Sequence, residues 1–264
     1  MTKETSETGT IHAQSHDRVL HIRIDHTTKR NAITPHMLGR LARMLTLFEE
    51  NADQWVALVT ADGDHTTAGL DMPRFFGPDA SWNGFQPDEV HPFGLGRRCT
   101  KPIVMVIQGI TFTAGIEIML GIADIVVAAD TARLSQLEPK RGIVATGGAH
   151  FRFVQRSGWG NAMYHLLRAD TFDAAEALRI GLVQEVVPHG EHVERGWAIA
   201  REIAAHAPLA VQATKIAAQR YLQGAEAEAI GMLPWMQEQT RGTADAAEGL
   251  QSFIERRAAV FHGR

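Results

Sequence analysis

The sequence has little cysteine and no excess of charge of either sign. Cys99 is the single cysteine among 264 residues, which excludes an intramolecular disulfide and a cysteine-rich metal site. This favours a reducing compartment, and we expect a cytoplasmic protein. The formal net charge is only -4, and the chain has no basic stripe of the kind that follows a phosphate backbone. We therefore expect no nucleic-acid partner.

The sequence also lacks long apolar runs. Met1 to Gln14 is polar and has no apolar core of the kind that a secretory signal needs, so we expect residues 1–16 to form a flexible N-terminal tail. The longest apolar stretches, Ile103 to Ile110 and Ile116 to Ala129, are interrupted by polar residues and are too short to span a bilayer. We expect neither a membrane segment nor a membrane partner.

Apolar residues are nevertheless abundant, at 45% of the chain, which is enough for a large core. Three short runs rich in β-branched residues predict buried parallel strands: Trp55 to Thr60, Ile103 to Ile107 and Ile125 to Ala128. Val19 to Ile24 predicts another strand, and Asn31 to Asn51 carries leucines at helical spacing. Strands that alternate with helices predict an α/β fold with its ligand site beyond the carboxyl ends of the strands.

From about Asp173 onward the composition shifts to alanine-rich helix, interrupted only by a predicted strand over Val183 to Val187. The candidate helices are Ala174 to Ile180, His192 to His206, Pro208 to Gln223, Ala225 to Gln239 and Ala244 to Arg257. We therefore expect an α/β catalytic core over residues 17–190 and a helical region over residues 191–264. Such a region either docks against a neighbouring subunit or forms a self-contained helical subdomain.

Two segments with small residues could present backbone NH groups to a ligand. Ala68-Gly69-Leu70-Asp71 follows a predicted strand, although an ordinary turn before a helix has the same pattern. Gln108 to Glu117 combines a strand end, a small-residue turn and the start of an apolar helix, whose free NH groups can stabilise an oxyanion. Glu117 lies in the first turn of that helix, where it either caps the helix or faces a site.

Glu138 is a second candidate for proton transfer. Pro139 disfavours helix at Glu138, so this side chain can point into a cleft, and a surface salt bridge is the alternative. Two carboxylates on different segments can act as acid and base if their environments separate their pKa values. His12 and His16 have a ligand spacing but no third ligand nearby, so we expect no metal site. Serine-hydrolase, dinucleotide-binding and P-loop signatures are absent or incomplete.

Together, four segments resemble the ordered signatures of the crotonase (enoyl-CoA hydratase/isomerase) superfamily: Lys29 to Ala32, Ala68 to Asp71, Gly109 to Glu117 and Leu137-Glu138. Ala175 to Val183 and Glu248 to Arg257 are also similar to it, so the resemblance covers the chain from about Asp17 to its end. It implies a crotonase-like spiral of ββα units with a C-terminal helical trimerisation region, often paired into hexamers. It also implies an acyl-CoA substrate and no separate cofactor.

The resemblance assigns roles to individual residues. Two backbone NH groups that bind the thioester oxygen in the family map onto Leu70 and Ala114. Its two glutamates, which hold a water and deliver it across a C=C bond, map onto Glu117 and Glu138. The positions that line the coenzyme pocket are Lys29, Ala32, Ala68 and Asp71, and those that reach it from a neighbouring subunit are Phe253 and Arg256. The implied activity is hydration of a 2-enoyl-CoA thioester to a 3-hydroxyacyl-CoA.

Departures from the family pattern affect the acyl pocket. Thr66-Thr67 replaces the usual Phe-Ser or Phe-Cys, and Thr113-Ala114-Gly115 replaces a common triple glycine, but the backbone NH donors survive both changes. Leu137 and Ala145 stand where proline is usual, which bears on the shape of the pocket and the aim of Glu138. Double-bond isomerisation or thioester hydrolysis on the same oxyanion site is the alternative activity. A non-catalytic acyl-CoA binding protein is a third hypothesis.

Overall fold

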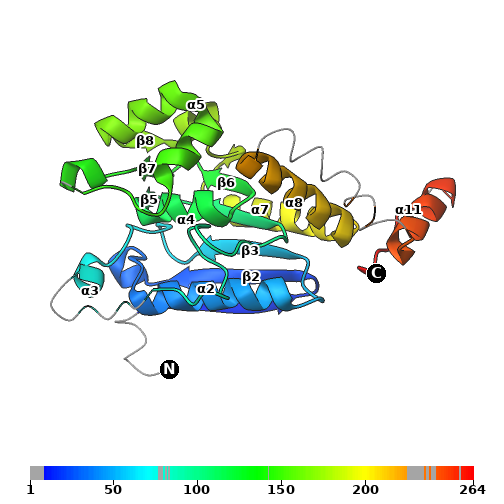
Figure 1. Ribbon diagram of the computed structural model, residues 1–264. Helices are drawn as coiled ribbons and strands as arrows, with labels where there is room; N and C mark the ends of the chain where they lie inside the picture. Colours follow the sequence, from blue (N-terminus) through cyan, green and yellow to red (C-terminus); the bar gives the residue numbers. More distant parts are fainter. Residues whose placement is uncertain are drawn as a thin grey trace.

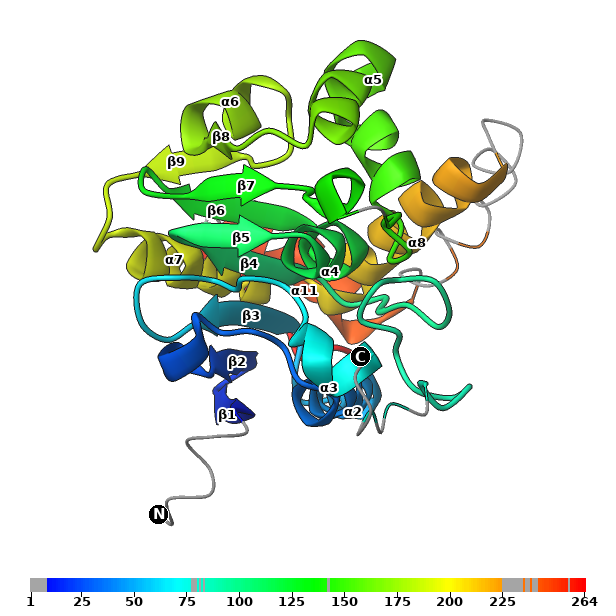
Figure 2. The same cartoon turned by 90° about the vertical axis from the view of Figure 1, so that its left-hand side faces the viewer.

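The computed structural model describes residues 9–76, 80, 82, 84–141, 143–224, 235, 238, 242–255 and 257–264. Its centre is a six-stranded sheet with the order β1-β2-β3-β4-β6-β9 (Figures 1 and 2). The strands are β1 (Thr10–His16), β2 (Val19–Asp25), β3 (Val56–Ala61), β4 (Ile103–Ile107), β6 (Ile125–Ala129) and β9 (Glu185–Val187). β1 pairs antiparallel with β2, and the other neighbours are parallel, as the alternation of strands and helices predicts.

A second sheet contains three short strands, β5 (Ile110–Phe112), β7 (Arg133–Ser135) and β8 (Phe172–Asp173). β5 follows β4 and precedes helix α4 (Ala114–Ile122). β7 follows β6 and precedes the 3-10 helix η2 (Glu138–Arg141) and helix α5 (Ala149–Arg168). After β3, an isolated parallel bridge from Thr67 to Thr111 precedes helix α3 (Met72–Phe76). The chain thus repeats a ββα unit.

Helices cover both faces of the six-stranded sheet. α2 (Pro35–Glu50) begins at Thr34, whose side chain accepts a hydrogen bond from the Met37 NH, and its apolar stripe packs into one core cluster. α7 (His192–Ala204) packs against the other face, where Gly196 lets it approach Leu58 and Val106. Because successive strand residues point to opposite faces, strands covered on both sides must be apolar throughout. This explains the short apolar runs in the sequence.

The remaining helices follow the predicted order. α6 (Ala174–Arg179) precedes β9, and α8 (Pro208–Gly224) and α11 (Ala244–Glu255) follow α7. Lys215 anchors α8, because its Nζ lies 2.7 Å from Asp124 Oδ2. In Figure 1, α11 (red) lies beyond the end of α8, far from α3. The predicted helix over Ala225 to Gln239 lies outside the described residues, apart from residues 235 and 238.

The structure corrects the predicted N-terminal tail. Thr10–His16 is not a loose segment, because it forms β1 and pairs with β2 along its whole length. In this edge strand only Ile11 is fully buried, so a polar sequence is compatible with it. Helix α5 was not predicted either. Its residue Gly158 has φ 74° and interrupts the helical backbone, which breaks any regular apolar spacing.

Three further features of the described residues concern the cysteine, membrane spans and metal ions. Cys99 is buried, and its Sγ lies 3.8 Å from the Leu45 carbonyl oxygen of α2. Within the described ranges, no helix is both long enough and apolar enough to cross a membrane. The same part of the chain contains no group of three His, Cys, Asp or Glu side chains that could hold a metal ion.

Candidate active site

A pocket of about 320 Å³ opens between the start of α4, the segment that leads into α3 and the 3-10 helix η2. Residues from three segments line it, within 68–76, 113–117 and 137–146. The four residues predicted to be catalytic, Leu70, Ala114, Glu117 and Glu138, all line this one pocket. The structure therefore brings together side chains and NH groups that lie up to 68 positions apart in the sequence, between Leu70 and Glu138.

Two backbone NH groups in this pocket donate to no acceptor among the described residues. The Asp71 NH donates to the Ile33 carbonyl, and the Gly69 carbonyl accepts from the Ile33 NH, so the backbone around Leu70 is fixed. Among the described residues, the Leu70 NH itself donates to no carbonyl. The Ala114 NH is at the first residue of α4 and has no acceptor within its own helix. Both groups can therefore bind an oxyanion.

The turn before α4 is conformationally unusual. Thr113 has φ 49° and ψ -117°, a region in which a β-branched residue is strained by about 1–3 kcal/mol. Its NH donates to the Ser135 carbonyl at 2.9 Å, which holds it in place. The segment opposite comes very close, since a Cβ on Gly69, whose φ is 101°, would collide with Thr113 Oγ1. Glycine tolerates both the positive φ and the close approach best. This explains why glycine is usual in the family at the position of Thr113.

Glu117 is buried, with 5% of its surface exposed. Its Oε1 accepts a hydrogen bond of 3.1 Å from the NH of Ala149, the first residue of α5. Glu117 therefore faces the pocket and also caps a helix, but the helix is α5 and not its own. Burial raises the pKa of Glu117, while the NH groups of Ala149 and Gly147 and the charge of Arg152 act in the opposite direction.

Glu138 is buried to a similar degree, with 8% of its surface exposed. Burial raises the pKa of Glu138, its own backbone NH acts against this, and the nearby charge of Glu117 raises it further. With its amide nitrogen turned toward them, Gln136 donates to Glu138 Oε2 and to the Thr113 carbonyl, both at 3.2 Å. Among the described residues Glu138 forms no salt bridge, so the surface ion pair considered from the sequence is not present.

Because Gly147 has no side chain, it leaves room for the Glu117 carboxylate. A Cβ at this glycine would lie 2.6 Å from Phe93 Cδ1 and 2.7 Å from Glu117 Oε2, closer than real contacts allow. Arg152, on the first turns of α5, donates to the Gly147 carbonyl at 2.8 Å and to the Gly94 carbonyl at 3.0 Å. Burial lowers the pKa of Arg152 to about 10. Sequence reasoning did not find these supports, because they depend on how α5 meets α4.

The residues predicted to line the coenzyme pocket lie around one loop. Ala68 lines the pocket, and its NH donates to the Arg30 carbonyl, which holds the 29–32 segment against it. Lys29 Nζ lies 3.3 Å from Asp71 Oδ2, and the Ala32 carbonyl lies 2.8 Å from His26 Nδ1. The predicted residues of the neighbouring subunit are not tested: the side chain of Phe253 and all of Arg256 lie outside what the structure describes.

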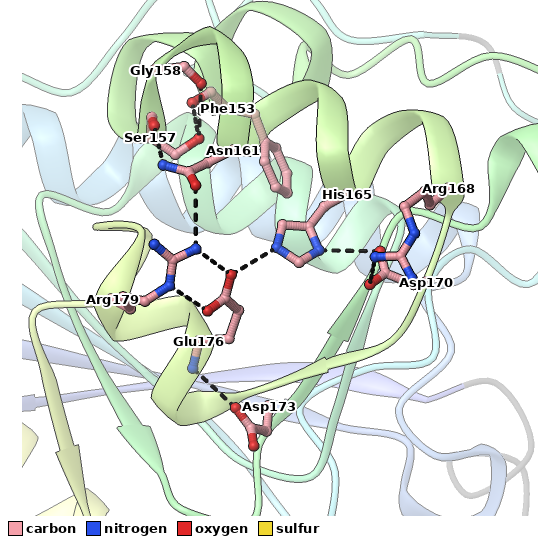
Figure 3. Close-up of polar contacts among 10 residues, drawn as sticks. All are labelled: Phe153, Ser157, Gly158, Asn161, His165, Arg168, Asp170, Asp173, Glu176 and Arg179. Carbon is pink, nitrogen blue, oxygen red and sulfur yellow. Dashed lines mark hydrogen bonds and ion pairs between the residues drawn. The ribbon is translucent and has the colours of Figure 1, made fainter.

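A second group of titratable residues joins α5 to α6, outside the pocket (Figure 3). The buried His165 lies between two carboxylates, with Nδ1 3.1 Å from Asp170 Oδ1 and Nε2 3.2 Å from Glu176 Oε1. Arg179 donates from Nε to Glu176 Oε2 at 2.6 Å and from Nη2 to Oε1 at 2.7 Å. The Arg179 hydrogen bonds, followed by that of His165, lower the pKa of Glu176 to about 2.

The chain is similar to known proteins over almost its whole length. A family model described as enoyl-CoA hydratase/isomerase matches residues 14–264. The enoyl-CoA hydratase EchA19 of Mycobacterium tuberculosis is 27% identical over 267 residues, which cover 100% of this chain and 99% of the relative. The 2,3-dehydroadipyl-CoA hydratase of Escherichia coli is 27% identical, over 94% of this chain and 96% of the relative.

Solved structures give the same result. A probable enoyl-CoA hydratase/isomerase from Mycobacterium abscessus matches with a TM-score of 0.91 and 41% identity, over 98% of this chain and 100% of that chain. An enoyl-CoA hydratase from Bacillus anthracis matches with a TM-score of 0.88 and 26% identity, over 97% and 100% of the two chains. These matches confirm the crotonase-like α/β fold that the sequence motifs implied.

Proposed function

The chain belongs to the enoyl-CoA hydratase/isomerase family, and from that premise we propose that it adds water across the double bond of a 2-enoyl-CoA thioester. The product is a 3-hydroxyacyl-CoA. The observation that carries this proposal is a single pocket that holds two buried carboxylates, Glu117 and Glu138, beside two backbone NH groups that have no acceptor among the described residues. An oxyanion site together with an acid and a base is what conjugate addition of water requires.

In this mechanism the NH groups of Leu70 and Ala114 bind the thioester oxygen. Attack of water at C3 moves electron density onto that oxygen, so the two hydrogen bonds strengthen as the enolate forms. Donors fixed by the backbone need no reorganisation during the reaction, and each such donor contributes about 100-fold to 1000-fold in rate. The strained turn at Thr113 keeps the Ala114 donor in position.

The two glutamates divide the proton transfers. Glu117 accepts a proton from the attacking water, because the Ala149 and Gly147 NH groups and Arg152 stabilise its ionised form. Glu138 donates a proton to C2, because its neighbour Glu117 favours its protonated form. The water oxygen bonds to C3 and the enolate collapses to the thioester. Different surroundings thus give two chemically identical side chains different roles.

The proposal extends to the assembly. The chain acts as a homotrimer or a hexamer of two trimers, in which Phe253 and Arg256 of one subunit reach the coenzyme of another. In the single chain, Figure 1 places α11 far from α3, so α11 could contribute to this pocket only between subunits. Coenzyme A enters as part of the substrate, and no further cofactor takes part.

A substrate panel with product identification tests the function. The full chain is incubated with a 2-enoyl-CoA such as crotonyl-CoA, a 3-enoyl-CoA and a β-ketoacyl-CoA, and the products are identified by mass. A 2-enoyl thioester that gains one water supports hydration. A 3-enoyl thioester that converts without a change in mass would replace the proposal with isomerisation. Release of free coenzyme A would indicate hydrolysis, and binding without any product would indicate a non-catalytic role.

A further inference from the structure

Arg141 is the only basic residue that lines the pocket within the described part of the chain. It is the last residue of η2, and Glu138 is the first. In a 3-10 helix, side chains three residues apart lie on the same face. The helix that aims Glu138 into the pocket therefore places Arg141 on its wall as well.

The Arg141 guanidinium has no partner among the described residues, since no carboxylate or carbonyl binds it. Glu138, the acidic residue of the same short helix, forms no ion pair with Arg141 among the described residues. The guanidinium is thus an exposed cation on the wall of the pocket that holds the two glutamates. A cation on a pocket wall without a protein counter-ion suits an anionic group on the ligand.

The rest of the pocket rim is apolar. Met72 and Phe76 on one side are 42% and 72% exposed, and Ile143 and Val144 on the other are 45% and 77% exposed. Exposed apolar residues at the mouth of a pocket are typical of a surface that a ligand covers. Arg141 comes two residues before Ile143 in the sequence. An acyl chain that covers this rim would therefore bring its far end close to Arg141.

We propose that the preferred substrates are 2-enoyl thioesters with a carboxylate at the far end of the acyl group, and that Arg141 binds this carboxylate. The inference rests on the proposed function and names its substrate class. A carboxylate accepts two parallel hydrogen bonds from one guanidinium, which gives both affinity and orientation. A neutral alkyl end would cover the guanidinium without replacing its hydration, which costs binding free energy.

The phosphates of coenzyme A are the other source of anionic oxygens. The pantetheine arm separates these phosphates from the thioester, and the residues predicted to contact the coenzyme lie on other segments of the chain, around Lys29 and Asp71. The acyl carboxylate is therefore the better match for a cation on the same short helix as Glu138. Thioesters of pantetheine, which lack the coenzyme phosphates, distinguish the two sources.

The test compares kcat/KM for a matched pair, 2-hexenoyl-CoA and its analogue with a terminal carboxylate, in the wild type, Arg141→Met, Arg141→Lys and Lys140→Met. We expect the wild type to favour the carboxylate by about 10-fold or more, as one charged hydrogen-bonded pair allows. In Arg141→Met this ratio falls to about one, and Arg141→Lys retains part of it. Lys140→Met removes the same charge from the same helix, outside the pocket lining, and keeps the wild-type ratio.

The same acyl pair on pantetheine, which lacks the coenzyme phosphates, identifies the source of the anion. A preference that persists there and disappears in Arg141→Met supports the proposal. If Arg141→Met instead weakens both coenzyme A thioesters equally and neither pantetheine thioester, Arg141 binds phosphate and the proposal is wrong. It is also wrong if the wild type hydrates both acyl groups equally well.

Failure of the hydratase function gives a different result, because then no thioester of either pair gains water. In that case, calorimetric binding of the saturated thioesters to the same proteins still decides whether Arg141 selects a carboxylate. Equal affinities of the wild type for the two saturated acyl groups would overturn the inference on its own.

Discussion

Two regions of this molecule use buried or partly buried carboxylates in opposite ways. In the network of His165, Asp170, Glu176 and Arg179, every charge has a partner, and the pKa of Glu176 falls to about 2 (Figure 3). In the pocket, Glu117 and Glu138 form no salt bridge among the described residues, and burial raises the pKa of each. The fold thus fixes the charge of one glutamate and leaves two others able to change theirs.

The difference separates a structural role from a chemical one. A carboxylate held ionised by an arginine joins α5 to α6 but cannot exchange a proton near neutral pH. A carboxylate buried without a salt bridge is less favourable for folding, yet its proton is available for transfer, which is why perturbed pKa values gather at active sites. Substitutions in the two regions distinguish the structural role from the chemical one.

The largest effect is expected when the pocket carboxylates become amides. Glu117→Gln and Glu138→Gln should each lower kcat for crotonyl-CoA by about 100-fold or more, because an amide neither accepts nor donates the required proton. The matched variant Glu176→Gln alters the network and should leave kcat close to the wild-type value. Steady-state kinetics of the three proteins measure this. If either pocket variant kept its activity, its role as acid or base would be refuted.

A smaller loss is expected from Gly147→Ala. The new methyl group would lie 2.7 Å from Glu117 Oε2 and must displace this carboxylate or the Phe93 ring. Misplacement of a catalytic group by a fraction of an ångström should lower kcat by about 10-fold to 100-fold. Gly160→Ala is the control, because a Cβ there meets nothing within 4 Å. Equal activity of the two variants would show that Glu117 does not need its observed position.

The two regions should respond to neutralisation with opposite changes in stability. Glu176 has a lowered pKa, so its charge stabilises the fold above its ordinary pKa of 4.5, and this stabilisation is lost as pH falls toward 2. The pKa of Glu117 is raised in the folded protein, because burial favours its protonated form. The stability that this protonated form contributes to the fold is lost as pH rises through the raised value. Glutamine stays neutral at every pH.

At pH 7 we therefore expect Glu176→Gln to unfold more easily than the wild type, by about 1 kcal/mol for a partly exposed pair. Glu117→Gln should be at least as stable as the wild type, and its advantage should shrink at acidic pH. Urea unfolding between pH 4 and pH 7 measures both. Changes of the same sign at pH 7 would show that the two regions do not differ in the way inferred from their pKa values.

The smallest effect is expected at the oxyanion turn. Thr113→Gly removes the strain of a β-branched residue at φ 49° but leaves the Ala114 NH in place. We expect kcat within a few-fold of the wild type and unfolding free energy changed by less than about 1 kcal/mol, because relief of strain offsets the added chain flexibility. A large loss of activity would mean that the Thr113 side chain itself takes part in the reaction.

The sequence predicted those parts of the fold in which local pattern and burial agree. β4 was predicted with its observed bounds, because a strand covered on both faces is apolar throughout. β1 was missed since an exposed edge strand is polar, and the three-stranded sheet was missed because its strands have three residues or fewer. Helix α5 was not predicted because Gly158 breaks the helical spacing of its apolar residues.

Prediction of the site had a similar limit. Composition and spacing alone favoured ordinary roles for Glu117 and Glu138, and only the order of several motifs pointed to a shared pocket, where the structure places both. Gln136, Gly147 and Arg152 could not be inferred in this way. Their contributions arise from contacts between segments distant in sequence, such as the hydrogen bond from the start of α5 to Glu117.

The burial of Cys99 has a practical consequence. Burial raises the pKa of this thiol to about 12, so it stays protonated and shielded in the folded protein. A cysteine introduced at an exposed position on the pocket rim, such as Val144→Cys, would then be the thiol that reacts with a maleimide dye. Such a singly labelled protein would report ligand entry at the rim by fluorescence, without removal of the native cysteine.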